Sequence, residues 1–224
     1  MTSTTTIDPS QPLLLTSTTP HLPTLLTLAV HLHAHCILHS GTLATFLPPL
    51  SHPKMLTWWQ SRLDEVSAGQ RHIILYLLPV SSRTTSTGTT TPIPDPIFAA
   101  DPPSPTAGPL PTITLNNTTY DLAGLVTLSM PPSETGPMRG LVEKLFTSPH
   151  HRRKGVARTV MSELERVARR EGRWNLLLDT TVGSEAEGVY PRLGWERCGF
   201  VREYGVHPGT GEWVDEVWFG KDLR

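Results

Sequence analysis

The sequence predicts an α/β protein, in which helices pack against one β-sheet. Apolar residues recur at three- and four-residue steps in three long segments, which is the spacing of helices with one buried side. Between and after these segments lie short runs rich in Leu, Ile and Val, which are typical of buried strands. The expected helices cover residues 22–40, 53–66 and 156–171. The expected strands cover residues 12–16, 72–80, 112–115, 122–129, 141–147, 174–181, 198–204 and 213–221.

Length, charge and cysteine content limit the class of protein. A chain of 224 residues can bury one sizeable core, and a formal net charge of −1 does not favour nucleic acid as a partner. The segment 1–11 lacks the basic start and apolar run of a secretion signal, and we expect it to be disordered. The segment 22–38 is too short and too polar for a membrane span. We therefore expect no membrane partner. Because Cys36 and Cys198 cannot form a disulfide framework, we expect a reducing compartment and hence a cytoplasmic protein.

Histidines cluster in the first expected helix and just after it. Their spacings are two and four residues: His31, His33, His35 and His39. Spacing alone would allow a metal site, but no Cys, Asp or Glu lies beside them. We therefore expect no bound metal.

Two adjacent tryptophans lie in the second expected helix. Trp58 and Trp59 point about a third of a turn apart, so we expect one in the core and the other near its rim. Trp59 is a candidate wall of a substrate pocket, and core packing is the alternative interpretation.

The segment 81–111 differs in composition from the rest of the chain. Ser, Thr, Pro, Gly and Ala dominate it, and few large apolar side chains are available for burial. Strands of the same expected sheet flank it on both sides. We therefore interpret it as a disordered insertion within a single domain that covers residues 12–224.

A basic turn joins the strand at 141–147 to the helix that follows, with the sequence Arg152-Arg153-Lys154-Gly155-Val156-Ala157. A helix N-terminus presents unpaired backbone N–H groups and the positive end of the helix dipole. Gly155 would let a ligand approach the backbone without a Cβ in the way. The turn therefore predicts a diphosphate site, and a merely basic helix start on a solvated face is the alternative.

A short helix is expected at 184–193, between the last three strands. Ser184 would cap it, with Glu187 three residues later, and Gly194 would end it. A tyrosine, Tyr190, lies within this segment.

The order of strand, R-x-x-G-x-A turn, helix, strand, and short helix with a tyrosine resembles the GNAT superfamily of N-acetyltransferases. The acetyl-CoA signature of that superfamily is Q/R-x-x-G-x-G/A, and Arg152, Gly155 and Ala157 fill its three fixed positions. Within the superfamily, the segments 178–195 and 46–51 look like the tabtoxin-resistance type of small-molecule acetyltransferase. The resemblance spans most of the chain outside 81–111.

This resemblance implies a particular sheet. It would be a mixed, mostly antiparallel sheet of about seven strands flanked by helices, with a bulge in the strand before the basic turn. The sheet would splay between the strand that ends near Thr147 and the strand that ends near Thr181.

The resemblance also implies acetyl-CoA as the cosubstrate. The turn would bind its pyrophosphate, and the end of the preceding strand would pair with its pantetheine arm through backbone groups. Ser184 would replace an asparagine that many relatives carry where this chain has Gly183. The implied cofactor-binding residues are Leu145, Phe146, Thr147, Arg152, Arg153, Lys154, Gly155, Val156, Ala157, Arg158, Ser184 and Tyr190.

The catalytic and substrate residues follow from the same resemblance. Tyr190 matches a tyrosine that protonates the departing thiolate in many relatives, although a core tyrosine is the alternative. Glu143 is the candidate general base, although it could equally be a surface residue of its strand. The candidate substrate-binding residues are Trp59, Asp179 and Asp215.

The function implied by the resemblance is transfer of an acetyl group from acetyl-CoA to the primary amine of a small molecule. Detoxification of an amino-acid-like toxin or antibiotic would be the role of the tabtoxin-resistance type. We expect a monomer or homodimer. The alternatives are acetylation of protein N-termini or lysines, and a non-catalytic CoA-binding regulatory paralogue.

Overall fold

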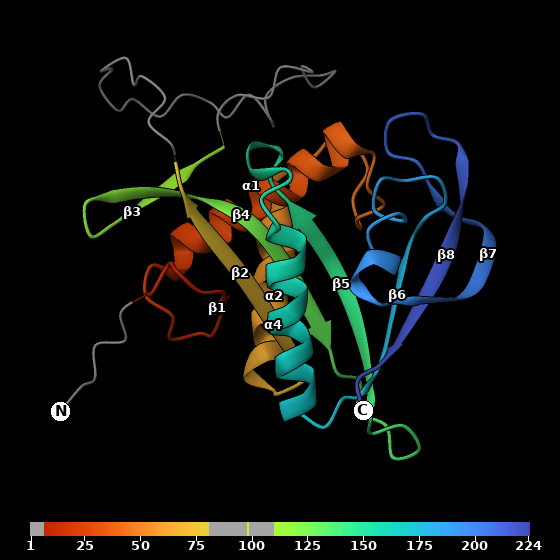
Figure 1. Cartoon of the computed structure of the whole chain (residues 1–224). Helices are drawn as coiled ribbons and strands as arrows, with labels where there is room; N and C mark the ends of the chain where they lie inside the picture. Colours follow the sequence, from red (N-terminus) through yellow and green to blue (C-terminus); the bar gives the residue numbers. More distant parts are fainter. Residues whose placement is uncertain (1–6, 81–97, 99–109) are drawn as a thin grey trace.

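The computed structural model describes residues 7–80, 98 and 110–224, which form one mixed β-sheet with helices on both faces (Figure 1). The order across the sheet is β1-β2-β4-β5-β6-β8-β7, and β3 pairs with β4. Every pair is antiparallel except β5 with β6. The strands are β1 (Leu13–Leu14), β2 (Arg71–Pro79), β3 (Thr112–Leu115), β4 (Thr118–Ser129), β5 (Arg139–Thr147), β6 (Asn175–Thr181), β7 (Glu196–Val206) and β8 (Trp213–Asp222). The predicted α/β fold is confirmed, and the sheet has eight strands where about seven were expected.

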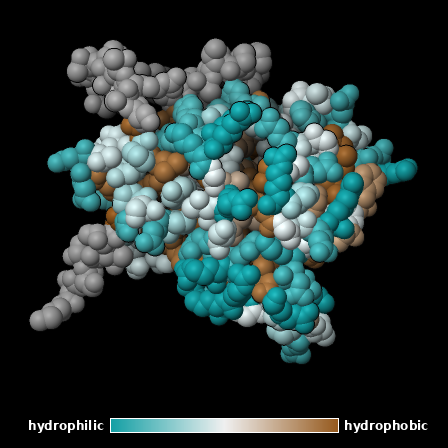
Figure 2. Space-filling view, viewed as in Figure 1, coloured by the Kyte–Doolittle hydropathy of each residue, from teal (hydrophilic) through white to brown (hydrophobic). Residues whose placement is uncertain are grey.

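The long helices occur where the apolar spacing predicted them: α1 (Leu22–Ser40), α2 (His52–Ser67) and α4 (Val156–Arg170). Two short 3-10 helices, η1 (Pro149–His151) and η2 (Pro191–Leu193), complete the described part of the chain. Figure 2 shows hydrophilic residues over the outer side of α4, as the one-sided apolar pattern of that helix requires.

The short helix predicted at 184–193 is instead a series of turns that ends in η2. Its predicted capping contact is present, because the Ser184 hydroxyl accepts a hydrogen bond from the Glu187 N–H at 3.3 Å. Gly188 is a poor helix former, and Pro191 has no N–H to continue an α-helical ladder. The segment therefore starts as a helix would but does not propagate.

Two hydrophobic layers lie on opposite faces of the sheet. Ile73, Leu75 and Leu77 of β2 pack with α1 and α2, whereas Ile74 packs with α4. This alternation is the one expected of a strand that is buried on both faces. The two faces of β2 are therefore shielded from water by different sets of helices.

Helix α1 is the most apolar helix among the described residues. The segment was expected to be too short and too polar for a membrane span, but by length and composition this helix could cross a membrane, with a mean hydropathy of 1.2. However, 67% of that window is buried inside the protein, against α2 and the sheet. A core helix has the same properties, and burial explains its composition.

The predicted splay lies between β5 and β6. These parallel strands share only three residue pairs, the last of which is Leu141 with Leu177. Figure 1 shows the two strands diverging beyond this point. A bulge in β5 accompanies the divergence, because two residues, Lys144 and Leu145, oppose the single residue Val126 of β4. Lys144 has a φ of 57°, an uncommon backbone conformation for a side chain other than glycine.

Some predictions concern residues outside the described part of the chain. These are the segments 1–6, 81–97 and 99–109, which include most of the predicted insertion and part of the predicted disordered N-terminus. The described part begins at Ile7, which is buried in the layer that contains α1.

Candidate active site

The basic turn lies between η1 and α4, at the mouth of the splay. Gly155 precedes the first turn of α4 with a φ of 76°, and a Cβ built there would meet no atom within 4 Å. Arg152, Arg153 and Lys154 are exposed beside it. The first N–H groups of an α-helix have no acceptor within the helix, so the turn combines open space, N–H donors and positive charge. This arrangement suits a diphosphate.

The end of β5 provides backbone groups beside the splay. Leu145 is the second bulge residue, and Phe146 and Thr147 follow it. Beyond Leu141, β5 pairs with β4 on one edge and has no ladder with β6 on the other. The Thr147 backbone is already hydrogen-bonded to the thiol of Cys36 in α1, and burial raises the pKa of that thiol to about 12. An extended ligand chain would therefore find free backbone groups on this edge mainly before Thr147.

Tyr190 lies at the start of η2 with only 5% of its surface exposed. Its ring packs against Phe219 at 5.5 Å between centroids. Burial, followed by the negative charges of Asp179 and Glu216, raises the pKa of the phenol. The hydroxyl therefore keeps its proton at neutral pH, which is the state that a proton donor requires.

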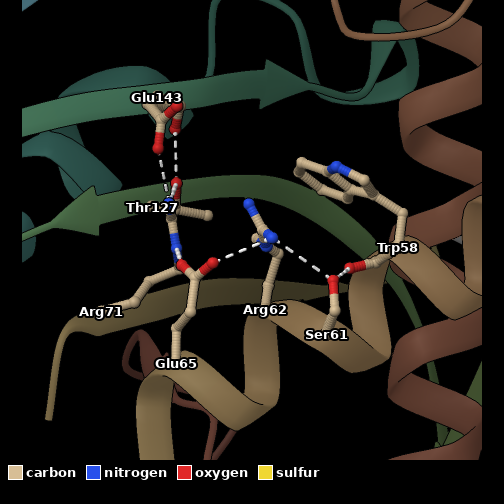
Figure 3. A network of polar contacts seen from close by, with 7 residues as sticks. All are labelled: Trp58, Ser61, Arg62, Glu65, Arg71, Thr127 and Glu143. Carbon is tan, nitrogen blue, oxygen red and sulfur yellow. Dashed lines mark hydrogen bonds and ion pairs between the residues drawn. The ribbon is translucent and has the colours of Figure 1, made fainter. Parts of the chain in front are cut away.

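Glu143 is held in a polar network that spans α2 and three strands (Figure 3). Arg71 of β2 donates from Nη1 to Glu143 Oε2 at 2.6 Å and from Nε to Glu65 Oε2 at 2.6 Å. The same Nη1 donates to the Thr127 hydroxyl at 2.9 Å, which in turn donates to the Glu143 carbonyl. Because a buried guanidinium already occupies one of its oxygens, the Glu143 carboxylate serves mainly to pair with Arg71.

A cavity of about 280 Å³ opens beside β6 and β8. Its walls are the connection from α1 to α2, the end of β7 and two carboxyl groups, Asp179 and Glu216. His33 fixes one wall, since its ring nitrogen Nε2 lies 2.7 Å from the Ala44 carbonyl. Burial lowers the pKa of His33 to about 3, so the ring is neutral and donates this hydrogen bond.

The two carboxyl groups of the cavity lie within hydrogen-bonding contact of each other. Glu216 is 3% exposed, and burial, a hydrogen bond with Asp179 and the charge of Asp179 together raise the pKa of Glu216 to about 9. Glu216 therefore keeps its proton at neutral pH. Such a pair can balance one ammonium group.

Lys144 brings a cation to the same region. Its ammonium lies 5.7 Å from the centroid of the Trp58 ring, at the bulge in β5. Burial lowers the pKa of this amine, while the charges of Glu143, Asp179 and Glu216 act in the opposite direction. The splay thus has a lysine on one strand and acidic groups on the other side.

Strand register explains why these groups are close. The last β5–β6 pair is Leu141 with Leu177, so Glu143 and Asp179 each lie two residues beyond it. Asp179 is opposite Trp218, and Glu216 lies two residues from Trp218 on the same face of β8. The sequence prediction missed Glu216 because Asp215 and Glu216 are adjacent acids, and only this register decides which of them faces the cavity.

Three other predicted residues are placed as follows. Asp215 accepts a hydrogen bond from the Glu203 N–H at 2.8 Å and so supports the irregular part of β7. Trp59 is fully buried in the core, whereas Trp58 is partly exposed at its rim, as the prediction of one core and one rim tryptophan required. Ser184 hydrogen-bonds with the Thr180 hydroxyl at 3.2 Å, beside β6. Of the predicted substrate residues, Asp179 is the one that lines the cavity.

No metal cluster is found in the part of the chain that the structure describes. There, no group of three or more His, Cys, Asp or Glu side chains is arranged to hold a metal ion. His35 and His39 of α1 contact each other with ring centroids 4.3 Å apart.

Comparison with known proteins agrees with this geometry. The model of the acetyltransferase (GNAT) family matches residues 88–195, which include the basic turn and Tyr190. The fold is similar to that of an N-acetyltransferase from Staphylococcus aureus Mu50, with 12% identity and a TM-score of 0.59 over 96% of this chain and 99% of the other.

Two Salmonella typhimurium structures have the same fold. One is assigned as an acetyltransferase and was solved with its cofactor acetyl-CoA (13% identity, TM-score 0.57, 96% of this chain and 95% of the other). The other is an acetyl transferase that modifies the N-terminal serine of ribosomal protein L7/L12 (12% identity, TM-score 0.61, 96% of each chain). The chain is therefore similar to GNAT acetyltransferases in the sequence of residues 88–195 and in the fold of nearly its whole length.

Proposed function

We propose that the chain is an acetyl-CoA-dependent N-acetyltransferase that acts on the primary amine of a small molecule. The observation that carries this proposal is the cavity beside the splay, with Asp179 and Glu216 in its wall. A volume of about 280 Å³ suits a small ligand, and two neighbouring carboxyl groups in its wall suit one ammonium group.

The residues at the splay fit acetyl-CoA. The open space at Gly155 and the N–H groups at the start of α4 suit the pyrophosphate, and the free edge of β5 suits an extended pantetheine arm. Arg152, Arg153, Lys154 and Arg158 would add charge contacts to the phosphates. When bound, acetyl-CoA supplies the activated acetyl group at the inner end of this slot.

The side chains near that end suggest how protons would move. The substrate ammonium must lose a proton before its nitrogen can attack the thioester carbonyl, and Asp179 with Glu216 would accept it. As the new C–N bond forms and the C–S bond breaks, the Tyr190 hydroxyl would donate a proton to the departing sulfur. Glu143 would hold Arg71 and the bulge in place instead of acting as the base.

The finer assignments rest on the resemblance in the segments 178–195 and 46–51. We propose the tabtoxin-resistance type of enzyme, which would detoxify an amino-acid-like toxin or antibiotic in the cytoplasm. Acetylation of protein N-termini or lysines, or a regulatory role without catalysis, are the competing functions.

Calorimetric titration with acetyl-CoA and a thiol-release assay would test these functions. The amine panel should include free amino acids, polyamines, aminoglycosides, and peptides with free N-termini or lysines. The proposal expects binding and turnover of at least one small amine, with a marked loss in Asp179→Asn and little loss in the surface control Asp222→Asn. Turnover of peptides alone would favour the protein-modifying function, and binding without any turnover would favour the regulatory one.

A further inference from the structure

A buried Asp–His pair lies directly beneath the basic turn. His151 of η1 is 4% exposed, and its Nε2 contacts the Oδ1 of Asp121 in β4, which is 5% exposed. On the other side of the ring, the ammonium of Lys154 lies 3.2 Å from His151 Nδ1. These three side chains form a continuous chain of contacts from the sheet to the basic turn.

We propose that Asp121 and His151 are positioning residues that orient Lys154 for the acetyl-CoA pyrophosphate. This inference rests on the proposed function, because it assumes that the basic turn binds acetyl-CoA. Asp121 and His151 themselves would not touch the ligand.

The protonation pattern follows from the donors available. A lysine ammonium can only donate hydrogen bonds, so His151 Nδ1 must accept. The ring proton is therefore on Nε2, where it points at the Asp121 carboxylate. A neutral ring with this tautomer is required, since an N–H at Nδ1 would face the Lys154 ammonium. One N–H of Lys154 is used by His151, which leaves two for phosphate oxygens.

Asp121 is suited to this role because its backbone is fixed on both sides. It is opposite Leu78 of β2 and Thr112 of β3 in two antiparallel ladders. The turn is less regular, with Arg153 at a φ of 62° and Gly155 at 76°. A rigid strand therefore anchors a turn that has few regular backbone contacts of its own.

The surroundings of the pair favour the same arrangement. The second carboxylate oxygen of Asp121 lies 3.7 Å from His150 Nδ1. The buried Ser148 hydroxyl accepts a hydrogen bond from the His150 N–H, and its carbonyl accepts one from the His151 N–H. Because Asp121 is buried, removal of His151 would leave its charge without its closest partner.

The test is a double-mutant cycle on acetyl-CoA binding, measured by isothermal titration calorimetry. Asp121→Asn removes the charge that holds the proton on His151 Nε2, and Lys154→Met removes the cation at the turn. A charge-assisted hydrogen bond is worth enough for each variant to weaken acetyl-CoA binding about tenfold. Because Asp121 would act through Lys154, the double variant should bind about as weakly as Lys154→Met alone.

Controls separate this role from general damage. Asp222→Asn removes an exposed carboxylate that pairs with Arg224 and should leave the affinity for acetyl-CoA unchanged. His151→Phe keeps the ring volume but both nitrogens are lost, and it serves as a second probe of the pair if Asp121→Asn does not fold. Circular dichroism melts would identify any variant that is not folded.

Nitrogen-15 spectra of the histidine rings supply an independent readout. The Nε2–H tautomer of His151 should be present in the wild type and should be lost or mixed in Asp121→Asn. Independent losses that multiply in the double variant, or an Nδ1–H tautomer in the wild type, would overturn the proposal. Failure of the wild type to bind acetyl-CoA would instead remove the proposed function, and the tautomer would still show whether the Asp121–His151–Lys154 chain exists.

Discussion

Arg71 provides the most direct test of the polar network in Figure 3. The variant Arg71→Met keeps most of the side-chain volume but leaves Glu65 and Glu143 without their shared cation. Loss of one partner from a buried ion pair costs about 3–5 kcal/mol. The Arg71 side chain is 5% exposed, but those of Glu65 and Glu143 are 28% and 30% exposed, so water can partly replace the guanidinium. We therefore expect a loss of about 2–3 kcal/mol in the free energy of unfolding.

Urea denaturation would measure this loss, with the denaturant dependence of the free energy expected to stay the same. Arg62→Met is the matched control, since Arg62 pairs with Glu65 at 2.9 Å but its side chain is 26% exposed. Its loss should be at most about 1 kcal/mol. A smaller effect for Arg71→Met than for Arg62→Met would refute the assignment of Arg71 as the centre of the network.

Three further variants test the site. Gly155→Glu should lose acetyl-CoA binding in calorimetry, because its carboxylate would repel the phosphates and the positive φ at this position is strained for a residue with a Cβ. An affinity close to that of the wild type would contradict the pyrophosphate assignment. Tyr190→Phe should lower kcat about a hundredfold in the thiol-release assay, with a much smaller change in KM, and a normal kcat would rule out the proton-donor role. Glu216→Gln should change the pH dependence of stability. The raised pKa of about 9 means that folded protein keeps a proton that the unfolded chain releases near 4.5, so wild-type stability falls as pH rises through that window. Glutamine does not titrate, so the variant does not lose stability in this way. Thermal melts at pH 5 and pH 8.5 should therefore show that the variant gains stability relative to the wild type at the higher pH. The same pH dependence in both proteins would argue against a buried, protonated Glu216.

Local patterns predicted the three long helices and the basic turn because their causes are local. The spacing of Val156, Val160 and Leu164 is enough to predict α4, and Gly155 with its basic neighbours marks the start of that helix. The splay and the bulge were expected only through the family resemblance. Nothing in the residues 141–147 themselves indicates that β5 and β6 diverge after Leu141.

The contacts that decide the candidate site join residues far apart in the chain. Arg71 meets Glu143 across 72 positions, and Asp121 meets His151 across 30. Strand order and register create these contacts, and neither follows from periodicity. For the same reason, the sequence analysis named Asp179 and Asp215 as candidate substrate residues, whereas the structure places Asp179 and Glu216 in the cavity wall.

The narrow junction of β5 and β6 also affects how the protein would respond to a ligand. Within the described residues, the half of the sheet formed by β1 to β5 is joined to the half formed by β6 to β8 by a ladder of three residue pairs. An extended ligand in the gap would act as an additional strand, so the ladder would become continuous across the whole sheet. Amide hydrogen exchange should then slow first along the facing edges of β5 and β6, and the two halves should unfold more cooperatively.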